Sequence, residues 1–138
     1  MERLGGRYLL ADAGPLYALL DPSDQYHERA VAEGTKLVEA GYDVAIAYPT
    51  LHEVHSLVLY RLSRMAAMKF LGEAEERTTF LAPTGSHYRT AIERLSRYPD
   101  QSLSLADAVV GVLAEQLRLP VWSYDHHFDI MRISVWRP

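Results

Sequence analysis

The chain has 138 residues, of which 49% are hydrophobic, and it carries no cysteine and a formal charge of −4. This length suits one core, so we expect a single domain over residues 1–138. The lack of cysteine excludes disulfides and thiolate metal sites, and the negative charge argues against a protein that binds nucleic acid by net positive charge alone. No apolar run approaches the roughly 20 residues that cross a bilayer, and no signal peptide is evident, so we expect a cytoplasmic protein without membrane contact.

The first predicted element is a strand over residues 8–11, an apolar run that stops at Asp12. Gly14-Pro15 follows, and this pair is typical of a turn. The apolar residues 16–20 then favour a short helix. The pattern is therefore strand, turn, helix, with an acid at the end of the strand.

A longer helix is predicted over residues 23–40, where apolar side chains recur at helical spacing. Ser23 is suited to cap its start and Gly41 to end it. The apolar run 44–47 after it predicts a second strand.

Pro49-Thr50 is expected to open the next helix, which continues with a break near Ser63. Residues 78–81 favour a short strand, and a helix is expected over residues 86–98, closed by a proline.

The last third of the chain predicts a helix over residues 104–118, a strand over 120–123 that stops just before Asp125, and a final strand over 133–136. Strands that alternate with helices through short connections indicate an α/β fold with a mostly parallel sheet and helices on both faces.

Four acids occupy equivalent places in this pattern. Asp12 and Asp125 follow apolar strands, whereas Glu53 and Asp107 lie in the first turn of a helix. The carboxyl ends of parallel strands and the amino ends of the following helices share one edge of a sheet, where α/β proteins place their sites. We therefore expect these four side chains to lie near one another.

Each acid also has a purely structural interpretation. Residues 50–53 and 104–107 both fit the capping-box pattern, in which the acid bonds the backbone of the cap residue. Asp12 and Asp125 are equally suited to bond their own backbone in turns. These interpretations explain each acid separately and stay open at this point.

Carboxylates that gather at one edge repel one another unless a cation offsets their charge. Mg²⁺ and Mn²⁺ prefer oxygen ligands and keep several waters, so either ion suits such a cluster. Bound there, such an ion can activate water for attack on a phosphate ester.

The residues around the four acids carry a resemblance to a known family. The chain resembles the PIN-domain nucleases, and in particular the VapC-like toxins of toxin–antitoxin pairs, in four segments taken in order. They are Leu10-Ala11-Asp12-Ala13-Gly14-Pro15-Leu16, Pro49-Thr50-Leu51-His52-Glu53-Val54, Leu103-Ser104-Leu105-Ala106-Asp107-Ala108 and Ser123-Tyr124-Asp125-His126-His127-Phe128.

The resemblance implies a three-layer α/β/α domain and an Mg²⁺- or Mn²⁺-dependent endoribonuclease, the toxin of such a pair. It implies that the quartet of acids is both catalytic and metal-binding, that Ser123 helps to hold the site, and that Asp100 is a further, lower-ranked acid. The partners it implies are an RNA substrate, a cognate antitoxin and a second copy of the chain.

Other functions compete with this one. A phosphatase of the haloacid dehalogenase kind needs Asp-x-Asp, and Gly14 stands where the second acid is required. A catalytically silent module of the same fold that binds RNA or protein remains the main alternative. A histidine zinc site is disfavoured, because His52 and His55 are one residue too close for the His-Glu-x-x-His motif. His126 and His127 are expected to be exposed loop residues.

Basic side chains suited to contact phosphate lie on two predicted helices, although such residues usually form only a solvated face. They are Arg61, Arg64, Lys69, Arg89, Arg94 and Arg97.

Overall fold

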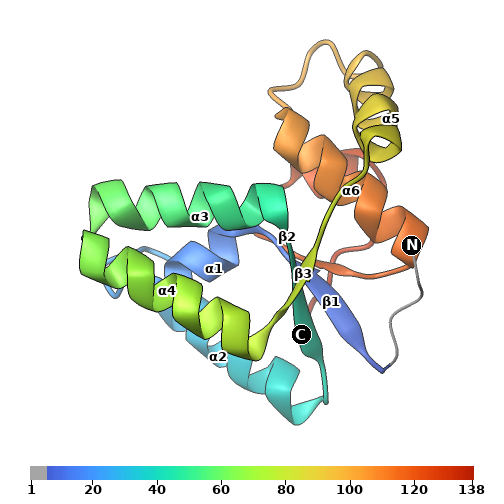
Figure 1. Cartoon of the computed structure of the whole chain (residues 1–138). Coiled ribbons are helices and arrows are strands. Elements are labelled where there is room, and N and C mark those ends of the chain that lie inside the picture. The colour runs from blue at the N-terminus through green and yellow to red at the C-terminus, as the bar shows by residue number, and fades with distance from the viewer. Residues whose placement is uncertain (1–5) are drawn as a thin grey trace.

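The computed structural model describes residues 6–138. A four-stranded sheet lies at its centre in the order β3-β2-β1-β4 (Figure 1), and each neighbouring pair is parallel. The strands are β1 (Tyr8–Ala11), β2 (Asp43–Ala47), β3 (Thr79–Leu81) and β4 (Val121–Trp122). All four were predicted from the sequence, because each is a short apolar run between turn signals.

Helices cover both faces of this sheet. One layer consists of α1 (Ala13–Leu20), α2 (His27–Glu39), α3 (Tyr48–Arg61) and α4 (Arg64–Arg77). The other consists of α5 (Gly85–Leu95), α6 (Leu105–Leu117) and α7 (His127–Ile130). Because neighbouring strand residues face opposite sides, Leu9 and Ala11 pack with the first layer and Leu10 with the second. The three-layer α/β/α fold is therefore confirmed.

Two predicted details at the start of the chain were wrong. Gly14-Pro15 is not a turn, because α1 already begins at Ala13. The first N–H groups of a helix have no acceptor within it, so Pro15 at the third helical position forfeits no hydrogen bond. Ser23 does not cap α2, which begins only at His27. The side chain of Asp24 instead accepts a hydrogen bond from the backbone of Tyr26 and holds a turn before the helix.

The end of α2 is as expected. Gly41 has a φ of +78°, a conformation that glycine adopts without steric cost. Its N–H donates to the Val38 carbonyl and that of Tyr42 to the Leu37 carbonyl, which together form the hydrogen-bond pattern of a Schellman motif.

The third and fourth helices separate at the predicted break, where Ser63 caps α4 by accepting a hydrogen bond from the Ala66 N–H. The expected capping role of Thr50 was wrong, because α3 begins at Tyr48 and Thr50 is buried inside its first turn. Pro49 near the amino end suits this earlier start.

The predicted last strand is reduced to one isolated bridge, between Val121 and Val135. Helices α5 and α6 are linked by a hydrogen bond of 2.9 Å between His87 Nε2 and Gln116 Oε1. Within residues 6–138, no helix has the length and apolar character that crossing a membrane requires.

Candidate active site

The ends of β1 and β4 bring Asp12 and Ser123 together. The Asp12 N–H donates to the Trp122 carbonyl, which continues the pairing of the two strands past their ends. The Ser123 hydroxyl donates to Asp12 Oδ2 at 2.8 Å and accepts a hydrogen bond from the Asp125 N–H at 2.9 Å. One hydroxyl thus holds the first predicted acid and the loop that carries the last.

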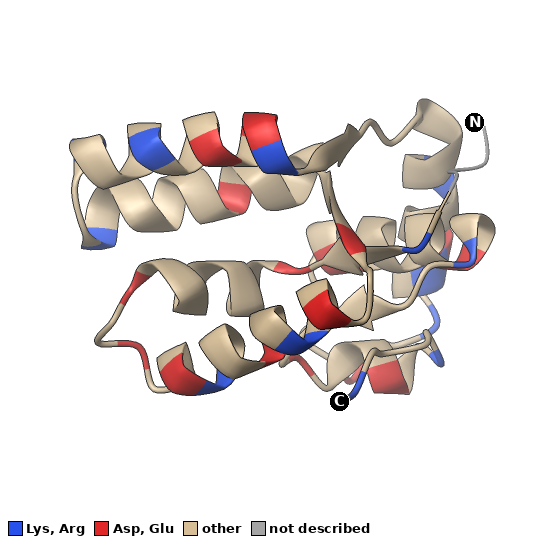
Figure 2. Ribbon diagram, turned by 90° about the horizontal axis from the view of Figure 1, so that it is seen from below, with Lys and Arg blue, Asp and Glu red and all other residues tan. Residues whose placement is uncertain are grey.

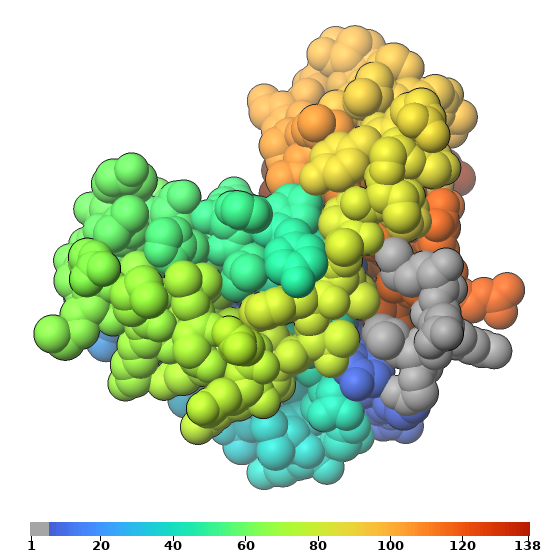
Figure 3. Space-filling model, viewed as in Figure 1, coloured from blue at the N-terminus to red at the C-terminus, as the bar shows by residue number. Residues whose placement is uncertain are grey.

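All four predicted acids line one cavity of about 580 Å³, which we call the acidic cavity. Asp12 and Asp125 reach it from the ends of β1 and β4, Glu53 from α3 and Asp107 from α6. Figure 3 shows the surface hollowed between α3 and the segment that leads into α6. In a parallel sheet, the carboxyl ends of the strands and the amino ends of the following helices lie at the same edge, which brings the four acids together.

The carboxylates raise one another's pKa. Burial, and to a lesser extent the charges of Asp107 and Glu53, raise the pKa of Asp12 to about 6, although the hydrogen bond from Ser123 opposes the shift. Burial also raises the pKa of Glu53, helped by Asp107 and Asp125. The pKa of Asp107 is raised by burial and by Asp125. The acids are therefore close enough to oppose one another's ionisation.

The structural interpretations of the acids are partly correct. Asp107 does form a capping box with Ser104, and Asp125 Oδ1 accepts a hydrogen bond from the His127 N–H, as a turn residue does. Glu53 has no capping role, because the N-cap of α3 is Ala47. The Asp12 carboxylate does not cap α1, although a hydrogen bond from the Ala13 backbone lowers its pKa. Capping thus accounts for neither Asp12 nor Glu53.

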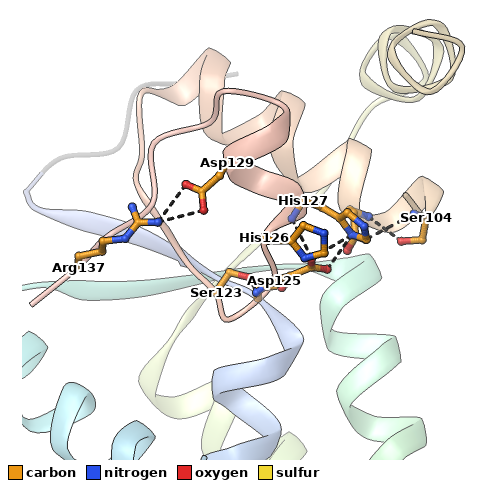
Figure 4. Close-up of polar contacts among 9 residues, drawn as sticks. Ser104, Ser123, Asp125, His126, His127, Asp129 and Arg137 are labelled. Carbon is orange, nitrogen blue, oxygen red and sulfur yellow. Dashed lines mark hydrogen bonds and ion pairs between the residues drawn. The ribbon is translucent and has the colours of Figure 1, made fainter. Parts of the chain in front are cut away.

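The histidines after Asp125 differ from expectation. His126 is exposed as predicted, but His127 is the first residue of α7 and its side chain is only 14% exposed. Its Nδ1 lies 2.9 Å from Asp125 Oδ1 (Figure 4). The same atom lies 3.7 Å from Asp107 Oδ2. The prediction failed because the short helix α7 turns this side chain inward.

The donor set fits a hard divalent cation. The buried Asp12, with its raised pKa, has no cationic side chain among the groups that shift that pKa, so a bound cation would stabilise its ionised form. Within residues 6–138, no three of the four carboxylates come within 4.8 Å of one another, whereas ligand atoms of Asp125, His126 and His127 do. An ion that keeps several waters, as Mg²⁺ does, suits the wider spacing of the carboxylates.

Of the six basic residues considered from the sequence, Arg61 lines the acidic cavity. Its guanidinium carbon lies 5.3 Å from the centre of the Tyr17 ring. Lys69, Arg94 and Arg97 pair with glutamates. Lys and Arg are spread over several elements instead of following one (Figure 2).

Asp100 is exposed in the loop before α6 and is not among the residues that line the cavity.

A buried carboxylate beside the site was missed. Glu33, on α2, accepts hydrogen bonds from Trp122 Nε1 at 3.1 Å and from the Tyr124 hydroxyl at 2.6 Å. Trp122 and Tyr124 flank Ser123, so Glu33 holds the loop that presents Ser123 and Asp125. In the sequence, the one sign of its burial was its position on the apolar side of the predicted helix. That position does not identify the side chains that Glu33 contacts.

The fold and the cavity together define an α/β/α domain with acids at the carboxyl edge of a parallel sheet. The sequence matches the PIN domain family over residues 9–133, and the chain belongs to that family. No curated protein matched the sequence at a significant level.

Several solved structures share the fold. VapC20 of Mycobacterium tuberculosis, described as a toxin that cleaves the sarcin-ricin loop, aligns with a TM-score of 0.82 and 20% identity, over 94% of this chain and 99% of that one. FitAcB of Neisseria gonorrhoeae aligns with a TM-score of 0.67 and 21% identity, over 94% and 97%. VapBC2 of Rickettsia felis, bound to a fragment of promoter DNA, aligns with a TM-score of 0.72 and 10% identity. The alignment covers 94% of this chain and 97% of that one. At these identities the likeness is one of fold.

Proposed function

We propose that this protein is a Mg²⁺- or Mn²⁺-dependent endoribonuclease that hydrolyses RNA phosphodiester bonds. The observation that carries the proposal is the meeting of Asp12, Glu53, Asp107 and Asp125 around one cavity in a chain of the PIN domain family. Membership of the family alone leaves open a silent module. The pKa of Asp12, raised to about 6, marks a carboxyl group that burial and charge have set apart from an ordinary surface acid.

The four carboxylates have the role of holding the metal in this proposal. Ser123 orients Asp12 through the 2.8 Å hydrogen bond, and His127 orients Asp125 from its Nδ1 atom. When bound, a divalent ion supplies charge that lowers the pKa of water and stabilises the departing oxygen of a phosphodiester. Asp100 is exposed away from the cavity lining, so we assign it no contact with substrate.

Arg61 is suited to bind a backbone phosphate of the substrate. It is exposed and lines the cavity with the acids. Its position over the Tyr17 ring limits the orientations of its guanidinium. A guanidinium at the rim of an acidic cavity attracts the anionic backbone that the carboxylates would repel.

The decisive experiment is cleavage of a mixed-sequence RNA by the wild type and by Asp12→Asn, each with Mn²⁺ and with chelator. We expect metal-dependent cleavage by the wild type and a loss of at least about 100-fold in the variant, because a primary ligand is removed. Asp43→Asn, at an exposed site at the start of β2, is the matched control and should cleave normally. Equal cleavage by wild type and Asp12→Asn contradicts the proposal. Thermal stabilisation by Mn²⁺ without cleavage favours the silent module.

We also propose that the protein is the toxin of a toxin–antitoxin pair, that it acts in the cytoplasm, and that it forms a homodimer. The likeness in fold to VapC20 and to the VapBC2 complex supports this proposal. Exposed apolar side chains on α3 and α4, and between them, offer surface for a protein partner. They are Tyr60, Leu62, Met65 and Met68.

The partner proposal is tested by measuring the molar mass of the purified chain and of a Met65→Glu variant in solution. We expect twice the chain mass for the wild type. A monomeric wild type contradicts the homodimer. A dimeric variant shows that the dimer does not depend on Met65, which is 83% exposed.

A further inference from the structure

Two tyrosine rings stand beside the acids in the acidic cavity. Tyr26 and Tyr124 both line it, and their ring centres are 5.1 Å apart with the planes inclined by 50°. Tyr26 is 39% exposed despite its size. Tyr124 directly precedes Asp125 in the chain, and both residues line the cavity. Aromatic surface therefore adjoins the acid cluster.

The Tyr124 ring is held in place at its hydroxyl and over one face. Its hydroxyl donates to the buried Glu33 at 2.6 Å, and burial together with Glu33 raises the pKa of Tyr124, so the hydroxyl remains a donor. The Arg29 guanidinium carbon lies 4.2 Å from the centre of the same ring and 5.9 Å from that of Tyr26. Arg29 also bonds Glu33, at 3.3 Å. A ring fixed in this way loses little freedom when a ligand packs against it.

We propose that the exposed ring of Tyr26, backed by the Tyr124 ring, forms a stacking site for one unpaired nucleobase of the RNA strand, next to the phosphate that is cleaved. The inference rests on the proposed ribonuclease function and adds to it the residues that hold a base beside the cleaved bond. Bases inside a duplex already stack on their neighbours, whereas an unpaired base is free to stack on an aromatic side chain. Such stacking tolerates every base, because each has a flat π-face.

The charges around the tyrosines favour a base over another aromatic ligand. Arg29 places its guanidinium against the rings while its Nε donates to Glu33. Arg29 also lines a neighbouring hollow with Arg137, which is paired with Asp129. Cations beside an aromatic surface are the combination by which single-stranded nucleic acid is held, with bases on the rings and phosphates on the guanidinium groups. Asp12 and Asp125, by contrast, disfavour a ligand that brings its own negative charge without a metal.

The test compares Tyr26→Ala and Tyr26→Phe with a closely matched control, Tyr48→Ala. Tyr48 is 42% exposed and lies 5.5 Å from the Phe80 ring at the same 50° inclination, but it does not line the acidic cavity. With a short single-stranded RNA we expect Tyr26→Ala to raise KM about tenfold, with a much smaller change in kcat, because stacking contributes to binding. Tyr26→Phe keeps the ring face and should restore most of the affinity.

A second measurement ties the effect to a base. RNAs that carry one abasic nucleotide at successive positions around the cleaved bond are presented to the wild type and to Tyr26→Ala. We expect one position at which the abasic change weakens cleavage by the wild type about tenfold and has little effect on the variant. The two losses are not additive, because both remove the same contact. Additive losses at every position overturn the stacking site.

Failure of the stacking site and failure of the proposed function give different results. If the wild type cleaves RNA and Tyr26→Ala behaves like Tyr48→Ala, the stacking site is wrong and the ribonuclease stands. If the wild type cleaves nothing, the affinity of the wild type, Tyr26→Ala and Tyr48→Ala for the same RNAs, measured by fluorescence anisotropy, still tests the tyrosines. Equal affinities of Tyr26→Ala and Tyr48→Ala then overturn the stacking site. Loss of binding to a protein partner, with RNA binding intact, assigns the rings to that partner and overturns the inference.

Discussion

Ser123 and Asp12 lie 111 positions apart in the chain and are joined by a hydrogen bond of 2.8 Å, from the serine hydroxyl to the carboxylate. The same hydroxyl oxygen accepts a hydrogen bond from the Asp125 backbone. It therefore couples the position of two of the four acids, and its hydrogen bond lowers the pKa of Asp12 against the effect of burial.

Replacing Ser123 by alanine should reduce RNA cleavage by about 10- to 100-fold, the usual effect of losing a side chain that orients a metal ligand. Because the pKa of Asp12 then rises further, the acidic limb of the pH–rate profile should move to higher pH. Ser123→Thr keeps the hydroxyl and should retain activity, and Ser134→Ala, at an exposed site, is the control. If the rate of Ser123→Ala is lower at every pH but its acidic limb does not move, Ser123 does not act through the pKa of Asp12.

The pKa of Asp12 makes the stability of the metal-free protein depend on pH. A folded-state pKa of about 6 against 3.8 means that folding favours the protonated carboxyl group. The stabilisation is complete below about pH 4 and is lost as pH rises through 6, and it amounts to about 3 kcal/mol. Urea unfolding with chelator present should show this loss in the wild type and not in Asp12→Asn. Excess Mn²⁺ should offset the loss at neutral pH, and parallel pH profiles of the two proteins contradict the prediction.

Glu33 should be important for stability although no acid of the quartet contacts it. Glu33→Ala leaves the buried Trp122 Nε1 and the Tyr124 hydroxyl without their acceptor. Each unpaired group costs about 1–3 kcal/mol, so we expect a loss of about 3 kcal/mol in thermal or urea unfolding, in a single transition if residues 1–138 form one domain. Glu39→Ala, at an exposed position on the same helix, should change stability by less than about 0.5 kcal/mol. Equal effects of the two variants exclude this role.

Arg61 should contribute to RNA affinity through one phosphate. Arg61→Ala is expected to weaken binding uniformly across RNA sequences and to reduce the slope of log affinity against log salt by about 1. Arg61→Lys should restore part of the affinity, since the charge is kept and the planar fork is lost. Arg64→Ala is the control, because Arg64 is exposed on α4 but does not line the acidic cavity. An unchanged salt slope in Arg61→Ala means that Arg61 contacts no phosphate.

The strands and the common edge of the four acids were predictable because they depend on local patterns. Apolar runs of four or five residues end at Asp12 and before Asp125, and helical spacing places Glu53 and Asp107 in first turns. Parallel topology then brings those places to one edge. The boundaries were less predictable. Thr50 matched a capping pattern, yet α3 begins at Tyr48, because the strand before it ends at Ala47 and the chain turns there at once.

The amino-acid sequence by itself determined the fold class and which acids face the same edge of the sheet, since apolar periodicity and turn residues act over a few positions. Only the tertiary structure decided that His127 turns toward Asp125, that Glu33 holds Trp122 and Tyr124, and that Tyr26 stands beside the acids. The partners of Glu33 are 89 and 91 positions away. Contacts over such separations depend on how whole helices pack on the sheet, and no short pattern of residues encodes them.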